Sequence, residues 1–334
     1  MRFSGIAAKL AATKGQFARA DALWMEEASS SFPVPLSPVK NPDGSWTTAA
    51  AISGYAAFSE GTSYRNNDYF YFRNKLSADI DIVKGVLKAQ TDYSYNYTIR
   101  KRVDVQNPIR YSKKPGVYLL ESESAGASLS QVNYDTRYQA ANAYLTFTPK
   151  LGADHDLSVL AGWNIEDQVY KTLSVSRAGF VTPNKPSFSL MNGVSEDPTA
   201  GGNAWSYVGA FYRVNYSYKG KYLVEASGRY DGSSKFPKDN RWAYFPSASA
   251  AWGFGEEKFV KNVKWISSGK LRAGIGTTGN NRVTDYAALT AFQITADSGY
   301  STGNTPGKGV VPKTLGNPKL KWETTVQTNI GLDM

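Results

Sequence analysis

The sequence of 334 residues contains no cysteine and a single histidine. The missing cysteines exclude disulfide bonds, thiolate zinc sites and a thiol nucleophile. Because His155 is the one histidine, multi-histidine metal sites are excluded, and a histidine-dependent catalytic triad would have to use this residue. Long apolar runs are missing too: none reaches the roughly 18 residues of a transmembrane helix. A charged content of 20% with 13% aromatic residues argues against a disordered chain.

Dense basic segments are also lacking, although the formal net charge is +10. The basic groups that do occur, Arg100-Lys101-Arg102 and Lys113-Lys114, lie beside turn residues. We interpret them as solvated charges and expect no nucleic-acid partner. The first twelve residues are interrupted by Arg2 and Lys9 and do not form a recognisable signal peptide.

What the sequence has in abundance is alternation with period two. Within residues 88–99, one set of alternate positions carries Tyr93, Tyr95, Tyr97 and Ile99, and the other set carries only polar residues. A strand places these sets on opposite faces, whereas a helix would scatter them. The same pattern predicts about eleven strands, at residues 2–11, 16–27, 76–82, 88–99, 138–147, 157–166, 208–218, 222–231, 247–254, 270–276 and 325–332.

The predicted connections alternate between short and long. Short turns are expected at residues 83–85, 150–154 and 219–221, and long loops at residues 100–133, 167–204 and 280–321. Short turns on one side and long loops on the other are typical of an outer-membrane β-barrel. We therefore predict an all-β, antiparallel, up-and-down transmembrane barrel with its long loops outside the cell.

Charge placement predicts which face meets lipid. Within the predicted limits, the charges of one strand share one face, as Glu225, Arg229 and Asp231 do, and the opposite face carries none. A charge facing lipid at mid-depth costs about 2–4 kcal/mol for Arg or Lys, so the charge-free face is the predicted lipid face. Tyr216, Tyr218 and Tyr222 flank the turn at 219–221, where an aromatic girdle would lie.

Three motifs invite a chemical interpretation. Gly274-Ile-Gly276-Thr-Thr-Gly279 matches a dinucleotide fingerprint, but the glycines follow a strand pattern and a loop follows them, so we expect glycines that make room for neighbours. Residues 231–242 form a polar stretch that offers carboxylates to calcium, and a cluster of stabilising charges is the expected role. His155 is expected to be a turn residue. We predict no catalytic, cofactor or metal site and no enzymatic activity.

Four separated blocks resemble one family. Residues 222–236 (YLVEASGRYDGSSKF), 241–252 (RWAYFPSASAAW), 270–280 (KLRAGIGTTGN) and 315–325 (LGNPKLKWETT) are similar to the barrel of SusC/RagA-type TonB-linked outer-membrane transporters. Residues 41–46 (NPDGSW) and 93–97 (YSYNY) fit the same family. The resemblance extends over most of residues 30–334.

The resemblance implies an energised nutrient importer in the outer membrane. Such proteins carry a plug and a TonB-contacting segment in a barrel of about 22 strands. They import glycan oligomers or peptides together with a SusD-like surface lipoprotein. Because we identify no plug and about eleven strands, residues 1–334 are expected to be a partial barrel domain, without its plug and remaining strands, that does not transport alone.

The predicted inner face supplies candidate substrate contacts. Mixed charges there are expected to pair across strands and line a wet interior, and an aromatic side chain could stack on a sugar ring. The candidates are Arg213, Glu225, Arg229, Asp231, Arg272, Glu323 and Trp205. The alternative is a soluble all-β carbohydrate-binding or adhesin-like module, which explains the strands but not the charge-free face.

Overall fold

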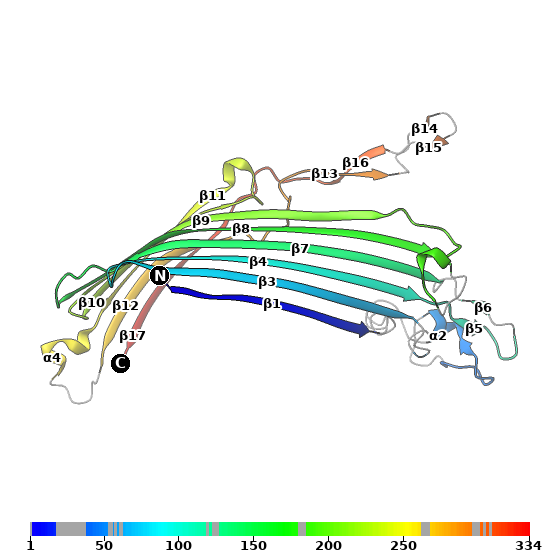
Figure 1. Cartoon of the computed structure of the whole chain (residues 1–334), viewed down its shortest axis with the longest axis horizontal. Coiled ribbons are helices and arrows are strands. Elements are labelled where there is room, and N and C mark those ends of the chain that lie inside the picture. Colours follow the sequence, from blue (N-terminus) through cyan, green and yellow to red (C-terminus); the bar gives the residue numbers. More distant parts are fainter. Residues whose placement is uncertain are drawn as a thin grey trace.

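A computed structural model of the chain describes residues 2–17, 38–52, 56, 59, 63–117, 120–121, 127–179, 185–261, 268–295, 301–302, 305–306 and 309–334. Its main element is a curved sheet of ten antiparallel strands that pair almost entirely in sequence order (Figure 1). The strands are β1 (Arg2–Phe17), β3 (Tyr64–Val83), β4 (Leu87–Gln106), β7 (Ser128–Phe147), β8 (His155–Ala178), β9 (Thr199–Tyr218), β10 (Tyr222–Ser233), β11 (Trp242–Trp252), β12 (Lys270–Asn280) and β17 (Glu323–Asp333). The all-β, up-and-down fold class is thus confirmed.

The strands differ from the prediction mainly in length. Those of the first half run for 16 to 24 residues, so much of the predicted loops at 100–133 and 167–204 is strand. The predicted hairpin around residues 13–15 is wrong: β1 runs through these residues and pairs with β3 from Arg2 to Phe17. Residues 18–27 of its second strand lie outside the described residues. Among the described residues the sheet has ten strands, against the eleven predicted.

The short turns lie where they were predicted. Between β9 and β10, Lys219 and Gly220 both adopt positive φ angles, of 51° and 65°. Two such residues in succession match the twist of a tight hairpin, and glycine adopts this conformation without steric cost. We call the edge of the sheet that carries these turns the turn end.

The two faces of the sheet differ as the alternation predicts. Large apolar side chains stand exposed on the convex face, including Trp163 and Val224, which are 49% and 53% exposed. The same face carries Leu76, Ile82, Ile165, Tyr212, Leu271, Ile275, Val326, Ile330 and Leu332, all exposed. A contiguous apolar surface of this kind is typical of contact with lipid rather than water.

Aromatic residues mark two levels on the convex face. Near the turn end, Tyr218 and Tyr222 stack at 6.3 Å. Eight residues further along β10, Tyr230 stacks on Trp242 at 5.1 Å. Eight residues span about 27 Å along a strand, or about 21 Å across the membrane at a strand tilt of about 40°, which is similar to the roughly 25 Å apolar band of an outer-membrane barrel. The predicted girdle at the turn end therefore has a counterpart at the other boundary of the band.

Glu257, in the connection between β11 and β12, binds the girdle at the turn end. The Tyr222 hydroxyl donates to it at 2.8 Å, Lys221 pairs with it at 3.2 Å and the Trp252 indole N–H donates at 3.4 Å. These hydrogen bonds, that of Tyr222 foremost, hold the pKa of Glu257 below its usual range. The aromatic side chains thus keep their polar atoms at a hydrated boundary.

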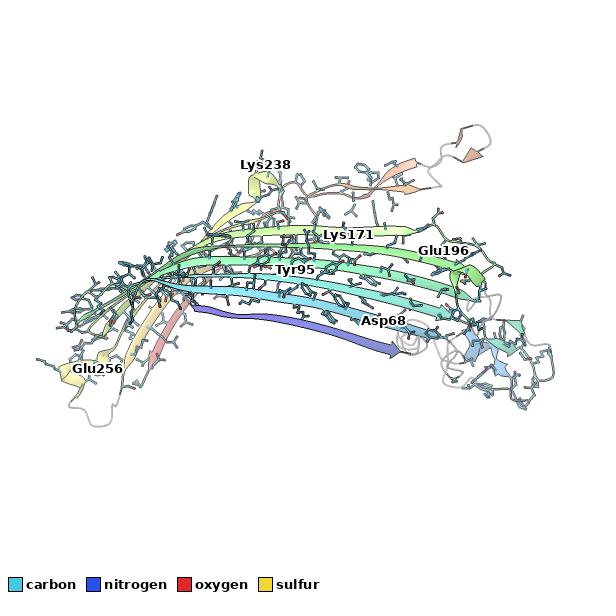
Figure 2. The ribbon with its side chains drawn as sticks, viewed as in Figure 1. Asp68, Tyr95, Lys171, Glu196, Lys238 and Glu256 are labelled. Carbon is cyan, nitrogen blue, oxygen red and sulfur yellow. The ribbon has the colours of Figure 1, made fainter. Side chains whose placement is uncertain are left out.

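The convex face is not free of charge over its whole length. Beyond the second aromatic level it carries Arg137 paired with Asp167 at 3.4 Å, and further out Asp135 lies opposite Lys171. Figure 2 shows Asp68 and Lys171 on the half of the sheet remote from the turn end. The predicted charge-free face is therefore correct for the apolar band and wrong above it, because the strands continue past the lipid boundary into water.

The long connections build small structures at the far end. One is a lobe of β2 (Trp46–Thr47), α2 (Thr48–Ile52), β5 (Arg110–Ser112) and β6 (Leu120–Glu121), which Figure 1 shows at the end of the sheet opposite α4 (Lys258–Lys261). The parallel pairing of β2 with β5 joins two connections, and Ile109 is buried against three alanines beside Trp46. Among the described residues, no helix is long and apolar enough to cross a membrane.

The final long connection carries further short elements. It holds the pairs β13 (Ala291–Thr295) with β16 (Gly309–Thr314) and β14 (Ser301–Thr302) with β15 (Thr305–Pro306). Single turns of 3-10 helix complete the connections at η2 (Phe188–Leu190), η3 (Lys238–Asn240) and η4 (Phe254–Glu256).

Asp43 should make the lobe sensitive to acid. It accepts hydrogen bonds from the Ser45 hydroxyl at 2.7 Å and the Gly116 amide at 2.8 Å, and these bonds lower its pKa from 3.8 to about 2. Because the folded-state pKa is the lower one, this stabilisation is complete above about pH 4 and is lost as the pH falls towards 2. The protection factor of the Gly116 amide, measured by hydrogen exchange, should drop over that interval. Asp43→Asn should lower it already at neutral pH, and an equal factor in both proteins would contradict the assignment.

Candidate functional site on the concave face

All seven candidate side chains lie on the concave face of the sheet. Glu225, Arg229 and Asp231 alternate along β10, and the strand registers place the other four on the same side. Three contacts use the expected cross-strand pairing. Arg213 meets Glu225 at 3.7 Å, Arg272 meets Asp333 at 3.2 Å, and Glu323 accepts a hydrogen bond from Asn280 at 2.8 Å. These side chains give the concave face a neutralised polar wall.

Arg229 is the centre of the densest polar cluster. Its guanidinium donates to both carboxylate oxygens of Asp231, at 3.0 and 3.2 Å, and to Asn164 and Tyr207, each at 3.0 Å. The Asp231 side chain is only 7% exposed, whereas the Arg229 side chain is 41% exposed. A buried carboxylate with a charged partner is well stabilised, and the remaining surface of the guanidinium faces the interior.

The cluster closes over a glycine on β9. A Cβ atom at Gly209 would collide with the Asp231 carboxylate and lie 2.6 Å from Arg229 Nη2. Gly209→Ala should therefore lower the free energy of unfolding by about 1–3 kcal/mol through overpacking. Gly201→Ala on the same strand is the matched control, since a Cβ atom there meets nothing within 4 Å. Urea unfolding in lipid vesicles measures both, and equal midpoints would contradict the packing described.

A cavity of about 440 Å³ opens beside this cluster. Trp205, Tyr207, Arg229 and Asp231 line it together with Glu166 and Trp322, so three of the seven candidates share one cavity. The Trp205 ring contacts the ring of Tyr138, at 6.4 Å, and the ammonium of Lys235, at 5.7 Å. Part of the ring is therefore covered by these neighbours, and part borders the cavity.

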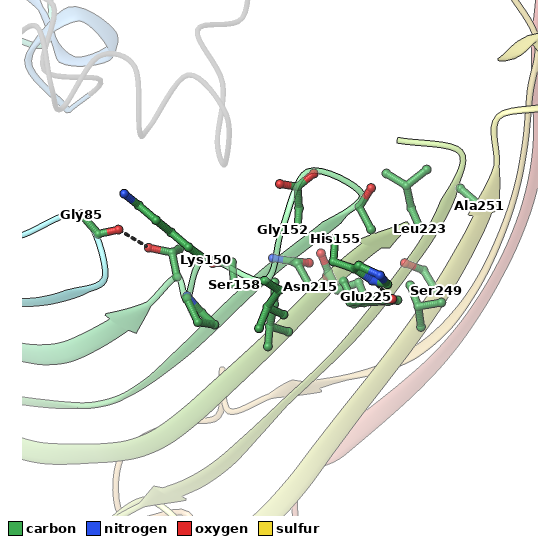
Figure 3. Close-up of a pocket in the computed structure, with 18 of the residues that line it drawn as sticks. Gly85, Lys150, Gly152, His155, Ser158, Asn215, Leu223, Glu225, Ser249 and Ala251 are labelled. Carbon is green, nitrogen blue, oxygen red and sulfur yellow. Dashed lines mark hydrogen bonds between the residues drawn. The ribbon is translucent and has the colours of Figure 1, made fainter. Parts of the chain in front are cut away.

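A larger cavity of about 860 Å³ lies at the turn end of the concave face. Figure 3 shows Ser158, Asn215, Glu225 and Ser249 around it, contributed by four strands. Its lining mixes small and hydroxylic side chains with charged and aliphatic ones, and no single chemistry dominates it. His155, the one histidine, begins β8 rather than a turn and contacts the Tyr216 hydroxyl at 2.7 Å.

Sequence reasoning missed a group of aromatic and basic residues on the same face. Tyr69, Tyr71, Arg100, Tyr134 and Tyr170 lie on β3, β4, β7 and β8, in parts of these strands that the prediction left out or assigned to loops. The signal was weak because aromatic, polar and charged residues occur on both faces of the strands there. Knowledge of the pairing register, which no single segment contains, would have been needed to find them.

The remaining motifs are structural. The glycines of residues 274–279 lie in β12, and a Cβ atom at Gly279 would enter the ring of Phe245. In the polar stretch 231–242, where a cluster of stabilising charges was expected, Asp231 belongs to β10 and binds Arg229, while Lys235 pairs with Asp285 at 3.0 Å. Throughout the described part of the chain, no three acidic or histidine side chains are grouped to hold a metal ion.

Comparison with known proteins identifies a family with this architecture. The TonB dependent receptor-like beta-barrel family matches residues 30–334. TonB-dependent receptor P3 of Formosa agariphila is 31% identical over 89% of this chain and 28% of its own length. TonB-dependent receptor SusC of Bacteroides thetaiotaomicron is 28% identical over 81% of this chain and 28% of its own. The structure of the RagAB peptide transporter superposes with a TM-score of 0.72 at 22% identity, covering 82% of this chain and 29% of that one.

These relatives are named as receptors and transporters, and the chain spans 28 to 30% of the length of the first curated relatives. The comparisons favour the barrel over the soluble module, in agreement with the exposed apolar band. The convex face of the sheet meets lipid of the outer membrane, and the concave face lines the interior of the barrel. The chain belongs to the TonB dependent receptor-like β-barrel family.

Proposed function

We propose that this chain forms part of the wall of an outer-membrane, TonB-energised importer of glycan oligomers or peptides. The polar concave face carries this proposal. Around the smaller cavity the charges are paired with one another, and Arg229 and Trp205 border the open space. This part of the wall offers hydrogen bonds to a passing solute without leaving an uncompensated charge to trap it.

The partners follow from the family. A SusD-like surface lipoprotein would deliver the nutrient to the end of the sheet that carries the long connections, and the TonB complex would supply energy through a plug in the same barrel. Residues 1–334 would contribute ten strands to a wall of about 22. The chain itself is proposed to carry out no chemical reaction, because in its described part the clustered acidic and basic groups Arg213 with Glu225 and Arg229 with Asp231 are bound to each other.

Deletion of the gene in its host tests the proposal. Uptake and growth should fail on one class among a panel of glycan oligomers and peptides, and the intact gene should restore both. A protonophore should abolish the same uptake, since it removes the energy source. Wild-type uptake of every nutrient by the deletion strain, or recovery of the protein from the soluble fraction, would refute the proposal.

A further inference from the structure

The group of residues that sequence reasoning missed forms a continuous platform. Tyr69, Arg100 and Tyr134 lie directly opposite one another on β3, β4 and β7, and Tyr71 and Tyr170 occupy the next row of the same face. We call these five residues the tyrosine platform. Because the register fixes all five on the concave side, they present one surface to the interior.

Close ring contacts hold the platform together. Tyr69 and Tyr71 stack at 5.8 Å with an interplanar angle of 7°, and Tyr134 and Tyr170 stack at 6.3 Å. The Arg100 guanidinium joins the two pairs, at 5.5 Å from the ring of Tyr69 and 4.9 Å from that of Tyr134. Such packing orients rings in advance, so a ligand that binds them loses little side-chain entropy.

The platform carries positive charge that the described residues do not neutralise. Arg100 donates only to the Asn67 side chain, at 2.8 and 3.0 Å, and forms no ion pair with a described carboxylate. Arg73, whose guanidinium lies 5.2 Å from the Tyr71 ring, likewise forms no ion pair with a described carboxylate. Asp104, the acidic residue close by, already pairs with Arg65 at 2.6 Å and Arg102 at 3.1 Å. The guanidinium of Arg100 therefore retains donors for an external anion.

The height of the platform places it outside the lipid. Tyr134 is thirteen residues from Phe147 at the turn end of β7, which is about 43 Å along the strand. A strand tilt of about 40° leaves about 33 Å, more than the roughly 25 Å of the apolar band. The convex side chains at the same level include the charged Lys101, Asp135 and Lys171, interspersed with Phe70, Ile99 and Leu173, as expected near and beyond the lipid boundary. A solute entering from outside would meet the platform before the cavity at Trp205.

We propose that the tyrosine platform binds an acidic oligosaccharide, with sugar rings on the tyrosines and a uronate or sulfate group on Arg100. This inference rests on the proposed function and names its substrate class. Flat aromatic faces suit the apolar faces of sugar rings, and the planar fork of arginine binds carboxylate or sulfate in two hydrogen bonds. A peptide is less suited, because its carboxylates stand on flexible stems rather than on rings held parallel to the wall.

Binding to the protein purified from its outer membrane in detergent tests the proposal. The probes are a galacturonate trimer, the neutral galactose trimer and a glutamate tripeptide, measured by isothermal titration calorimetry. The galacturonate trimer should bind at least about 10-fold more tightly than the galactose trimer, since a charge-assisted hydrogen bond contributes this much. Equal binding of the two sugars, or tighter binding of the glutamate tripeptide, would overturn the proposal.

Neighbouring residues of β4 supply a matched pair of variants. Arg100→Gln and Lys101→Gln each remove one positive charge, but from the concave and the convex face respectively. Arg100→Gln should weaken binding of the acidic trimer about 10-fold or more, and Lys101→Gln less than about 2-fold. Tyr134→Leu should weaken both sugars, because it removes a stacking surface. Equal affinities of the two charge variants would refute the assignment.

Uptake in cells separates this inference from the proposed function. If the gene supports energised uptake of a neutral glycan or a peptide, and Arg100→Gln leaves binding of the galacturonate trimer unchanged, the platform proposal fails while the importer proposal is supported. If the gene supports no uptake at all, the importer proposal fails whatever the platform binds.

Discussion

Replacing Ala226 with arginine should prevent the protein from assembling in the outer membrane. Ala226 is exposed on the convex face of β10, between Val214 and Ala248 on the neighbouring strands. It lies four residues from Tyr222 and four from Tyr230, and these two tyrosines mark the two aromatic levels. Its side chain therefore points to the middle of the lipid. Arginine at this depth costs about 2–4 kcal/mol, and that cost shifts the folding equilibrium by about 30- to 1000-fold.

Ser249→Arg is the control for this substitution. Ser249 lies one residue from the level of Ala226, on the concave face of β11, directly opposite Glu225 and beside the larger cavity. A guanidinium there reaches water and a carboxylate, so the variant should assemble normally. Heat-modifiable migration on gels reports the folded barrel in both cases. Normal folding of Ala226→Arg together with failure of Ser249→Arg would show that the two faces have been exchanged, and equal behaviour of the two variants would contradict the face assignment.

The alternation rule identified the faces because burial in lipid enforces it. Along β4, Tyr93 and Tyr95 face out while Asp92 and Ser94 face in, as the sequence predicts. The rule fails where lipid ends. On β7 the convex side chains change from Leu145 to Gln139 and then to Arg137 and Asp135, so both faces are polar and period two disappears from the sequence.

The alternation rule therefore ends each predicted strand at the lipid boundary, whereas the backbone hydrogen bonds between strands continue beyond it. The error at β1 has a related cause. Thr13-Lys14-Gly15 has the composition of a turn, but β3 continues alongside it and pairs with these residues at Tyr69, Asp68 and Asn67. A neighbouring strand that supplies backbone partners over the whole length overrides the local preference for a turn.

The candidate site was predictable to the extent that its residues lie inside the apolar band or at its edge. Arg229 and Asp231 were found from their charge on a clearly alternating strand, and their partners Asn164 and Tyr207 were not, because cross-strand neighbours depend on register. The tyrosine platform depends on register across four strands and lies wholly in the region where alternation is lost.

Phe236→Ala should release the long connection at 281–322 from the sheet. Phe236 is 1% exposed, and its ring lies 5.0 Å from that of Trp322, which in turn contacts Phe245 of β11 at 5.4 Å. Val283 and Leu320 complete this buried cluster. Truncating a buried phenylalanine costs about 3–5 kcal/mol. Surface connections open locally at free energies below that of global unfolding, so a loss of this size is expected to detach this one.

Detachment should be local, since the backbone pairing of β10, β11 and β12 does not depend on this cluster. Limited proteolysis of the assembled protein should cut within 281–322 many times faster in Phe236→Ala, while heat-modifiable folding stays normal. Phe292→Ala is the control: Phe292 lies in β13 of the same connection but is 61% exposed. Equal cleavage of both variants would show that the hydrogen bond of the Trp322 indole to Arg241 and the pair Lys235–Asp285 hold the connection without the cluster. Faster cleavage confined to Phe236→Ala would show that the connection, whose Asn281 and Trp322 line the Trp205 cavity, is held by apolar packing, and that its release is set by the burial of one ring.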